Sequence, residues 1–471
     1  MPQGLLPIRV EVVPHGDDVT ARAGHVLLHE TMLALGMPAL VKKHLRVARR
    51  WSKNSDFDKL ADLVHLQGAG GDCFDDISML AADEGLCRLL GRKPASAETL
   101  RQFLYVFDDP SLVDQARADA QKRDRLAYIV PDSPHLRGLA QVNAGVVAQI
   151  AKHLHARKAT LDHDATIVES HKREARAHYK GGRGYQPSVI YWAEGDLVLA
   201  DEFRDGNVPA GMENLALIKR GFSTLPQGIE ELGFRADSAC YENAVLKWLA
   251  DEHRDDGPRG IIGFTVSADM TEPLRHLCEA VPESQWKHLD DRATETVWCS
   301  DVEFTPGDWP KDACPLRYIA VRIRKNQGEL FSTGSDTKYL AVVSNRPGAA
   351  ADVLTWHWQK AGTIELVHDI MKNELGAGVL PCGRFGANAA WFRVSALTYN
   401  LLSAIKTLGL NAEHGTARPK RLRALVLTLP GRIVSHAGQL ILRVGEHAEK
   451  LAGLISARRN LLELVTAVAP A

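Results

Sequence analysis

Apolar residues recur at three- and four-residue spacing through most of residues 24–150, which predicts a largely helical region. The pattern is clearest in residues 25–45, 55–67, 75–91 and 93–107. Ser96 stands where the N-cap of the last of these helices is expected. The Gly-rich segment 68–76, GAGGDCFDD, lacks a preceding strand and a following Lys-Ser/Thr pair. The segment is therefore a weak candidate for a phosphate-binding loop, and we interpret it as an ordinary connecting loop.

From residue 159 the pattern changes to short apolar runs bounded by turn residues, which is typical of strands. It predicts strands at 159–170, 186–194, 195–204, 232–239 and 259–266, with helices at 214–225 and 241–253. This order predicts an α/β protein with a mixed sheet and helices packed on it. Residues 269–350 alternate and are rich in Trp, Thr and Val, which predicts a β-rich insert. Residues 351–375 and 388–409 return to helical spacing.

Composition and length limit the class of protein. The chain has 471 residues, of which 45% are hydrophobic and 24% charged, as in a multidomain globular protein. No run of about 18 apolar residues predicts a membrane span, and no signal peptide is apparent. The seven cysteines are scattered, and no two form a C-x-x-C pair. This pattern predicts a reduced cytoplasmic protein without a disulfide framework or zinc ribbon.

The net charge of −1 does not indicate a nucleic-acid partner. The distribution of charge, however, is compatible with one. Basic residues cluster at 42–53, 155–158, 171–185, 317–327 and 417–423. Each cluster is typical either of a solvated surface or of a local patch that binds DNA.

Four carboxylates are candidates for catalytic or metal-binding residues. Asp162 and Asp164 lie two residues apart in a strand and so share one face. Asp237 ends an apolar strand, and Glu365 lies in the helix after the β-rich insert. Carboxylates brought together repel one another unless a cation joins them, and hard oxygen ligands favour Mg²⁺ or Mn²⁺. Taken singly, Asp237 is more typical of a turn or a helix cap. Glu365 could be a solvated helix residue, and Asp162 and Asp164 could face water on an edge strand.

A resemblance to a known family narrows these alternatives. Its motifs are LDHDATIVESH with YKGGRGYQP, GFRADSACYENAVLKWL, and GTIELVHDIMKNELGAGVLPCGRFGANAAWF. Segments 75–104 and 418–444 match as well, in the same order. The chain resembles the DDE transposases of bacterial insertion sequences, group 1, in the insertion-sequence family numbered 1380.

The resemblance implies a ribonuclease H-like core with a β-strand insert before the catalytic Glu helix. The implied regions are 1–155, mostly helical and DNA-binding; 156–268, the first part of the core; 269–350, the insert; 351–411, the core part with the Glu helix; and 412–471, a basic C-terminal region. Asp164, Asp237 and Glu365 would be catalytic and hold two Mg²⁺ (or Mn²⁺) ions. Asp162 competes for the first position, and the Asp-x-Thr register favours Asp164.

Further residues become candidates for DNA contact. They are Lys180, Arg183 and Tyr185 in the Gly-rich segment YKGGRGY, Trp298 in the insert, Lys372, and the basic pair Arg421 and Arg423. Trp286, Trp298 and Trp309 could each stack on a base flipped out of DNA, although a tryptophan in a β domain is more often core.

One motif departs from the family. Related elements often carry Tyr-x₂-Arg-x₃-Glu-x₆-Lys, whereas this chain has Trp358 and Ala361 before Glu365 and Lys372. On one continuous helix these four residues would lie near one face. Lys360 is close to the position of the missing Arg.

The implied function is cleavage of DNA at transposon ends and strand transfer into target DNA by two-metal-ion phosphoryl transfer. The expected partner is double-stranded DNA, as terminal inverted repeats and target, bound by a homodimer on paired ends in the bacterial cytoplasm at the nucleoid, without a membrane. Two alternatives are a silent DNA-binding relic of a transposase and a metal-dependent nuclease without strand transfer. A purely structural module fits poorly with carboxylates on buried strands.

Overall fold

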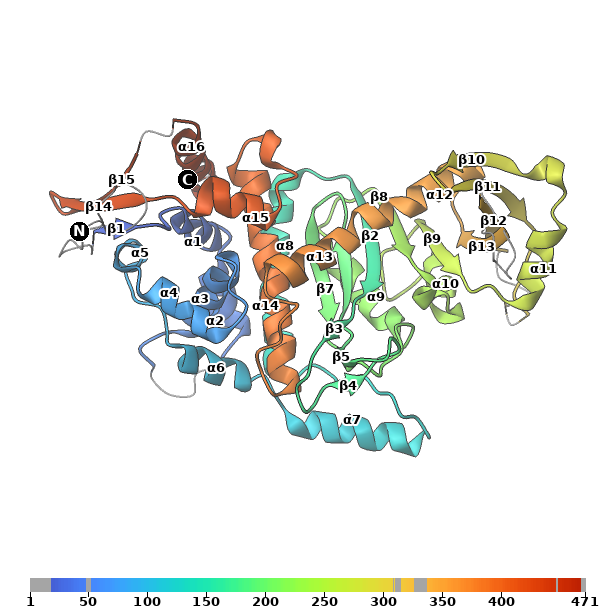
Figure 1. The fold of residues 1–471 in the computed structure, drawn as a ribbon, viewed down its shortest axis with the longest axis horizontal. Coiled ribbons are helices and arrows are strands. Elements are labelled where there is room, and N and C mark those ends of the chain that lie inside the picture. Colours follow the sequence, from blue (N-terminus) through green and yellow to red (C-terminus); the bar gives the residue numbers. More distant parts are fainter. Residues whose placement is uncertain are drawn as a thin grey trace, which may run out of the picture.

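The computed structural model describes residues 18–47, 52–307, 309, 315–325, 337–445 and 448–466. The molecule is elongated, with a helical region at one end, a mixed sheet in the middle and antiparallel strands at the other end (Figure 1). The first and last described elements, β1 (Val19–Thr20) and α16 (Ala448–Thr466), both lie at the helical end. None of the helices in the described ranges combines the length and apolar character that a membrane span requires.

The predicted helical region is confirmed. Ser55 and Asp58 form a reciprocal capping box at the start of one helix, and Ser96 caps another as expected. Ser133 caps the long helix that leads to the sheet. The helices are α1 (His25–Ala34), α2 (Met37–His44), α3 (Asp56–Gly68), α4 (Ile77–Ala81), α5 (Glu84–Leu89), α6 (Ala97–Tyr105), α7 (Pro110–Lys122) and α8 (Pro134–Leu154).

The central sheet has the mixed architecture that the sequence predicts. Its strands are β2 (Lys158–Ala165), β6 (Ser188–Trp192), β7 (Leu197–Glu202), β8 (Glu231–Ala236) and β9 (Ile262–Ala268). They lie in the order β7-β6-β2-β8-β9, where β2, β8 and β9 are parallel and β6 and β7 are antiparallel to their neighbours. Helices α9 (Asn214–Thr224) and α10 (Asn243–Ala250) connect the parallel strands. This is a ribonuclease H-like fold.

The β-rich insert extends the same sheet. Strands β10 (Lys287–Asp291), β11 (Glu295–Val302), β12 (Arg317–Lys325) and β13 (Thr337–Ser344) are antiparallel, and β13 pairs with β9. The result is one nine-stranded sheet. A helix that the pattern did not predict, α11 (Glu272–Ala280), lies between β9 and β10. The division of the chain into five functional regions stays a prediction.

The prediction of one continuous helix over 351–375 is wrong, because the helix is interrupted. The chain forms α12 (Ala350–Trp358), a 3₁₀ turn (Gln359–Gly362) and α13 (Ile364–Glu374). The backbone of Thr363 is not helical, with φ −115° and ψ −87°. The preceding residue, Gly362, has a low helix propensity, which makes a break at this point less costly. Trp358 and Ala361 therefore precede the break, and the expected single face with Glu365 and Lys372 does not form.

The remaining elements join the two ends of the chain to the core. Helix α14 (Phe385–Ala404) runs between the helical region and the sheet, and every one of its residues is buried. Then α15 (Pro419–Leu422) precedes a hairpin of β14 (Gly431–His436) and β15 (Gln439–Val444), and β14 pairs with β1. A separate small sheet of β3 (Val168–Glu169), β4 (Arg176–Ala177) and β5 (Arg183–Tyr185) follows β2.

Candidate active site

Two of the predicted carboxylates come from adjacent parallel strands. In the register of β2 and β8, His163 is opposite Ala236. The next residue on each strand is Asp164 and Asp237, respectively, so the two carboxylates leave the sheet at the same level. Both residues are partly buried. One oxygen of Asp237 also accepts a hydrogen bond from the backbone N–H of Ala239, at 3.1 Å.

Burial disfavours the charge of both carboxylates, and Asp164 also disfavours the charge of Asp237. Burial raises the pKa of Asp237, and the charge of Asp164 raises it further. Burial also raises the pKa of Asp164, and Lys360 opposes this effect by its positive charge. A bound cation would offset the cost of ionising these neighbouring, buried carboxylates.

Asp162, the competitor of Asp164, is engaged elsewhere. Its side chain is fully buried, and Arg235 donates two hydrogen bonds to it, at 2.6 and 2.9 Å. The hydroxyl of Thr363, at the break before α13, donates a third. The carboxylate is thereby neutralised within the protein, whereas Asp164 has no bidentate partner among the described residues.

Two side chains that sequence reasoning underestimated complete the surroundings of Asp164. The ammonium of Lys360, in the 3₁₀ turn, lies 3.6 Å from Asp164 Oδ1. The imidazole Nε2 of His368, in α13, lies 3.7 Å from Asp164 Oδ2. Both residues are buried. The sequence signal for His368 was its position three residues after Glu365, one helical turn along the same face.

The protonation state of His368 follows from its surroundings. Burial, with the charges of Lys372 and Lys360, lowers the pKa of His368 to about 3, and the backbone of Asp164 acts in the opposite direction. The ring is therefore neutral at pH 7. A neutral imidazole can act as a metal ligand or as a hydrogen-bonding group.

Glu365 stands farther out. It lies in the first turn of α13 and is exposed. Among the described residues, one group of at least three His, Cys, Asp or Glu side chains has all its ligand atoms within 4.8 Å, and it is Asp72, Cys73 and Asp76. Neither the set Asp164, Asp237 and Glu365 nor the set Asp164, Glu365 and His368 closes to that distance.

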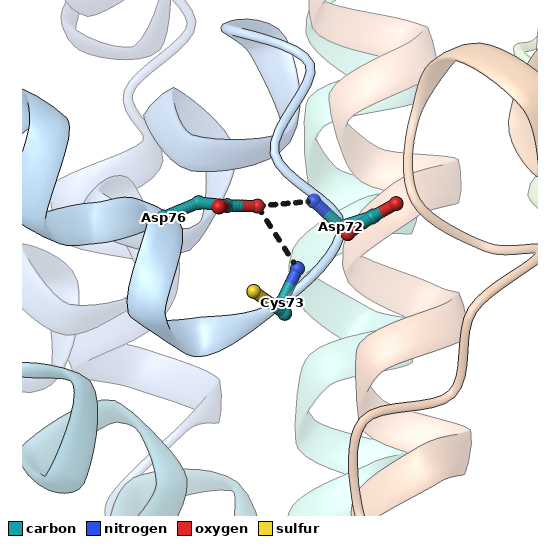
Figure 2. A group of neighbouring side chains, drawn as sticks. All are labelled: Asp72, Cys73 and Asp76. Carbon is teal, nitrogen blue, oxygen red and sulfur yellow. Dashed lines mark hydrogen bonds between the residues drawn. The ribbon is translucent and has the colours of Figure 1, made fainter.

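The group at Asp72, Cys73 and Asp76 has a structural explanation (Figure 2). One oxygen of Asp76 accepts hydrogen bonds from the backbone N–H groups of Asp72 and Cys73, at 3.0 and 3.3 Å. This arrangement caps the 3₁₀ turn at Phe74–Asp76. The segment is a loop, as predicted, and the carboxylate is already used by the backbone.

The donor set around Asp164 fits a divalent cation. Two partly buried carboxylates have pKa values raised by burial, the charge of Asp164 raises that of Asp237 further, and a third carboxylate, Glu365, lies on the adjacent helix. In addition, among the buried side chains described, both ring nitrogens of His368 lack a hydrogen-bond partner. A buried imidazole with free ring nitrogens next to carboxylates is a suitable ligand for a divalent ion.

Lys372 lies close to this site. Its ammonium donates to the hydroxyl of Thr166 at 3.0 Å and to the backbone carbonyl of Ile167 at 3.5 Å. Burial and the charge of Lys180 lower the pKa of Lys372, so two cationic side chains share this region just beyond β2. Lys180 itself is exposed.

The other two candidates in the Gly-rich segment have structural contacts. Arg183 is exposed but donates to the backbone carbonyls of Arg173 and Ala175, which shapes its own loop. The side chain of Tyr185 is fully buried, and its ring lies 5.0 Å from that of Phe203. The expected contact between Tyr185 and DNA does not fit this burial.

Trp298 is the least buried of the three tryptophans proposed to stack on DNA. The guanidinium carbon of Arg322 lies 4.5 Å from the ring centre of Trp286 and 4.9 Å from that of Trp298. Glu283 holds this arginine with two hydrogen bonds. Trp286 and Trp309 are buried, as expected for core residues.

The basic pair near the C-terminus separates into two roles. Arg421 is exposed. Arg423 is partly buried, and its guanidinium donates to the backbone carbonyls of Gly68, Gln67 and Glu374, at the ends of α3 and α13. The contacts of Arg423 are those of a helix-capping residue.

Comparisons with known proteins identify the family of this chain. The family model described as transposase DDE domain group 1 matches residues 6–466. A solved structure of the piggyBac transposase synaptic complex with hairpin DNA is similar, with a TM-score of 0.43, 10% identity, 95% of this chain covered and 85% of that chain. No curated protein matches the chain. Because the family match spans nearly the whole sequence, this chain belongs to the group 1 DDE transposases.

Proposed function

We propose that this transposase cuts DNA at the ends of a mobile element and joins the ends to target DNA, with Asp164, Asp237 and Glu365 as its acidic triad. One observation carries the proposal. Asp164 and Asp237 leave adjacent parallel strands at the same level, and the charge of Asp164 raises the pKa of Asp237. Asp162 is the weaker candidate, because Arg235 and Thr363 already saturate its carboxylate.

The triad would hold two divalent ions, Mg²⁺ or Mn²⁺. When bound, such ions supply the positive charge that activates a water or a 3′-hydroxyl and stabilises the charge that develops on phosphate. The protein's own contribution is to hold the carboxylates in place. Arg235 anchors the strand beside Asp164 through Asp162, and Lys360 favours the ionised form of both Asp164 and Asp237.

DNA would be held by basic side chains around this edge. Lys180 and Lys372 lie near each other just beyond β2, Arg183 lies in β5, which pairs with β3, and Arg421 is exposed on α15. Phosphate contacts of this kind position the duplex without reading its sequence. Trp298 would stack on an unpaired base. Tyr185 and Arg423 are left out of the proposed interface because their side chains are used internally.

Two DNA ends have to be joined in one event, so we expect a homodimer on paired terminal inverted repeats. The expected place of action is the bacterial cytoplasm, at the nucleoid, because DNA is the substrate.

The test is cleavage of a labelled duplex that carries the element's end, with Mg²⁺ or Mn²⁺. Wild type is compared with Asp237→Asn and Glu365→Gln, and each variant's DNA binding is measured in parallel. We expect the wild type to cut and join, and both variants to bind without reacting. Cleavage by the variants at the wild-type rate would disprove the triad.

Two other outcomes point to the alternatives. Cleavage by the wild type without joining to a second duplex would indicate a metal-dependent nuclease. Binding without any cleavage would indicate a silent relic of a transposase.

A further inference from the structure

The starting observation is a buried histidine whose ring makes no hydrogen bond of normal geometry. His368 is 4% exposed, and among the described residues neither of its ring nitrogens has a well-formed hydrogen bond, although the backbone of Asp164 lies close enough to act on the ring. Leaving a buried polar group unpaired is costly, so native proteins rarely keep one without a reason.

Two neighbouring buried histidines show what a structural role looks like. His357 has Ser267 and Thr265 at its two ring nitrogens, at 3.1 and 2.9 Å. His163 has Ser188 and Cys240, at 2.8 and 3.1 Å. His368 is as buried as these residues and has no such pair, which sets it apart from an ordinary core histidine.

His368 faces a carboxylate of the proposed site. Its Nε2 lies 3.7 Å from Asp164 Oδ2, too far for a hydrogen bond. Two ligands that each lie about 2.1 Å from one ion can be up to about 4.2 Å apart. The gap between His368 and Asp164 therefore has the width that a shared cation would fill.

The spacing along α13 supports the same conclusion. Glu365 and His368 form a Glu-x-x-His pair, and residues three apart project from one side of a helix. The same i, i+3 pairing supplies carboxylate and imidazole ligands to the metal sites of di-iron four-helix bundles.

We propose that His368 is a nitrogen ligand, together with Asp164 and Glu365, of one of the divalent ions in this site. The inference rests on the proposed function, because it assigns an additional ligand to the same metal centre. An imidazole ligand makes this position prefer a first-row transition ion such as Mn²⁺ to Mg²⁺.

The test is pulsed electron paramagnetic resonance of Mn²⁺ added to the full-length chain without DNA, which detects nitrogen bonded to the ion. Wild type is prepared with natural-abundance histidine and with ¹⁵N-labelled histidine. The variants are His368→Gln, Asp164→Asn and the matched control His357→Gln, also a buried histidine. Each is checked for folding by circular dichroism, and its Mn²⁺ and Mg²⁺ affinities are measured by calorimetry.

We expect a nitrogen coupling in the wild type that changes with the ¹⁵N label. It should be absent in His368→Gln and Asp164→Asn and present in His357→Gln. The Mn²⁺ affinity of His368→Gln should fall about tenfold or more, the size seen when a group that supports a metal ligand is removed. The Mg²⁺ affinity should fall less.

The remaining outcomes overturn the inference in distinguishable ways. Mn²⁺ that binds through Asp164 without any nitrogen coupling excludes His368 as a ligand and leaves the acidic triad intact. A coupling that persists in His368→Gln assigns the ligand to another histidine. Mn²⁺ binding that Asp164→Asn does not affect removes the proposed metal site as well. Should His368→Gln fail to fold, His368→Asn takes its place, because ¹⁵N labelling alone does not tell which histidine binds the ion.

Discussion

Arg235 donates two hydrogen bonds to the carboxylate of Asp162 across the parallel strands β2 and β8, at 2.6 and 2.9 Å. Both side chains are almost completely buried. Two residues along β2, on the same face, the charged side chains that contact Asp164 within the described ranges are a lysine and a histidine, at 3.6 and 3.7 Å. Strand β2 thus carries two different carboxylates. Asp162 is neutralised by Arg235, whereas Asp164 is available to bind a metal ion.

This difference predicts opposite effects of two matched substitutions. Asp162→Asn leaves the buried guanidinium of Arg235 without its counter-charge, which should cost about 3–5 kcal/mol of unfolding free energy. Asp164→Asn removes a charge that burial already disfavours, so stability should be unchanged or slightly higher, while DNA cleavage is lost. Urea unfolding and the cleavage assay separate the two. Equal destabilisation by both substitutions would contradict this assignment.

The sequence predicts the ends of strands better than it predicts contacts between them. Asp237 could be placed at the end of an apolar strand because a local run of residues shows where that strand stops. The pairing of Asp162 with Arg235 depends on the parallel register of strands 73 residues apart, which no local pattern encodes. The choice between Asp162 and Asp164 therefore needed tertiary structure.

The turn at residues 359–363 was missed for a different reason. Helical periodicity continues across it, so the pattern predicts one helix over 351–375. The break is stabilised by tertiary contacts, since the hydroxyl of Thr363 binds Asp162. It is this break that directs Lys360 toward Asp164.

Lys360 is predicted to control the pH dependence of cleavage. Its positive charge lowers the pKa of both Asp164 and Asp237, so Lys360→Met should raise both values. A higher pKa means that ionisation requires a higher pH. The acidic limb of the cleavage rate profile should therefore move to higher pH in Lys360→Met and stay in place in Lys360→Arg. A profile that loses amplitude equally at every pH would assign Lys360 a purely structural role.

Arg421 and Arg423 are predicted to separate DNA binding from stability. Arg423→Ala removes hydrogen bonds to the carbonyls that end α3 and α13, which should cost about 1.5–3 kcal/mol of unfolding free energy. Arg421→Ala should leave stability unchanged, because its side chain is exposed.

The DNA-binding measurement for this pair is the salt dependence of affinity. Loss of one phosphate contact in Arg421→Ala should lower the slope of log affinity against log salt by about 0.9. Arg423→Ala, measured where it is folded, should keep the wild-type slope. Identical slopes in wild type and Arg421→Ala would remove Arg421 from the interface.

Acid should destabilise the helical region through His25. Burial lowers the pKa of His25 to about 4, and its Nδ1 lies 3.1 Å from Nδ1 of His65. The unfolded chain binds a proton near pH 6.5, whereas the folded chain does so only near pH 4. The unfolded state therefore gains protons first, and stability falls as the pH drops from 6.5 to 4, by roughly 3 kcal/mol for this group.

Urea unfolding between pH 7.5 and 4.5 should show this slope, flatter in His25→Gln and unchanged in the exposed control His276→Gln. If His25→Gln keeps the wild-type slope, the acid sensitivity arises from another group.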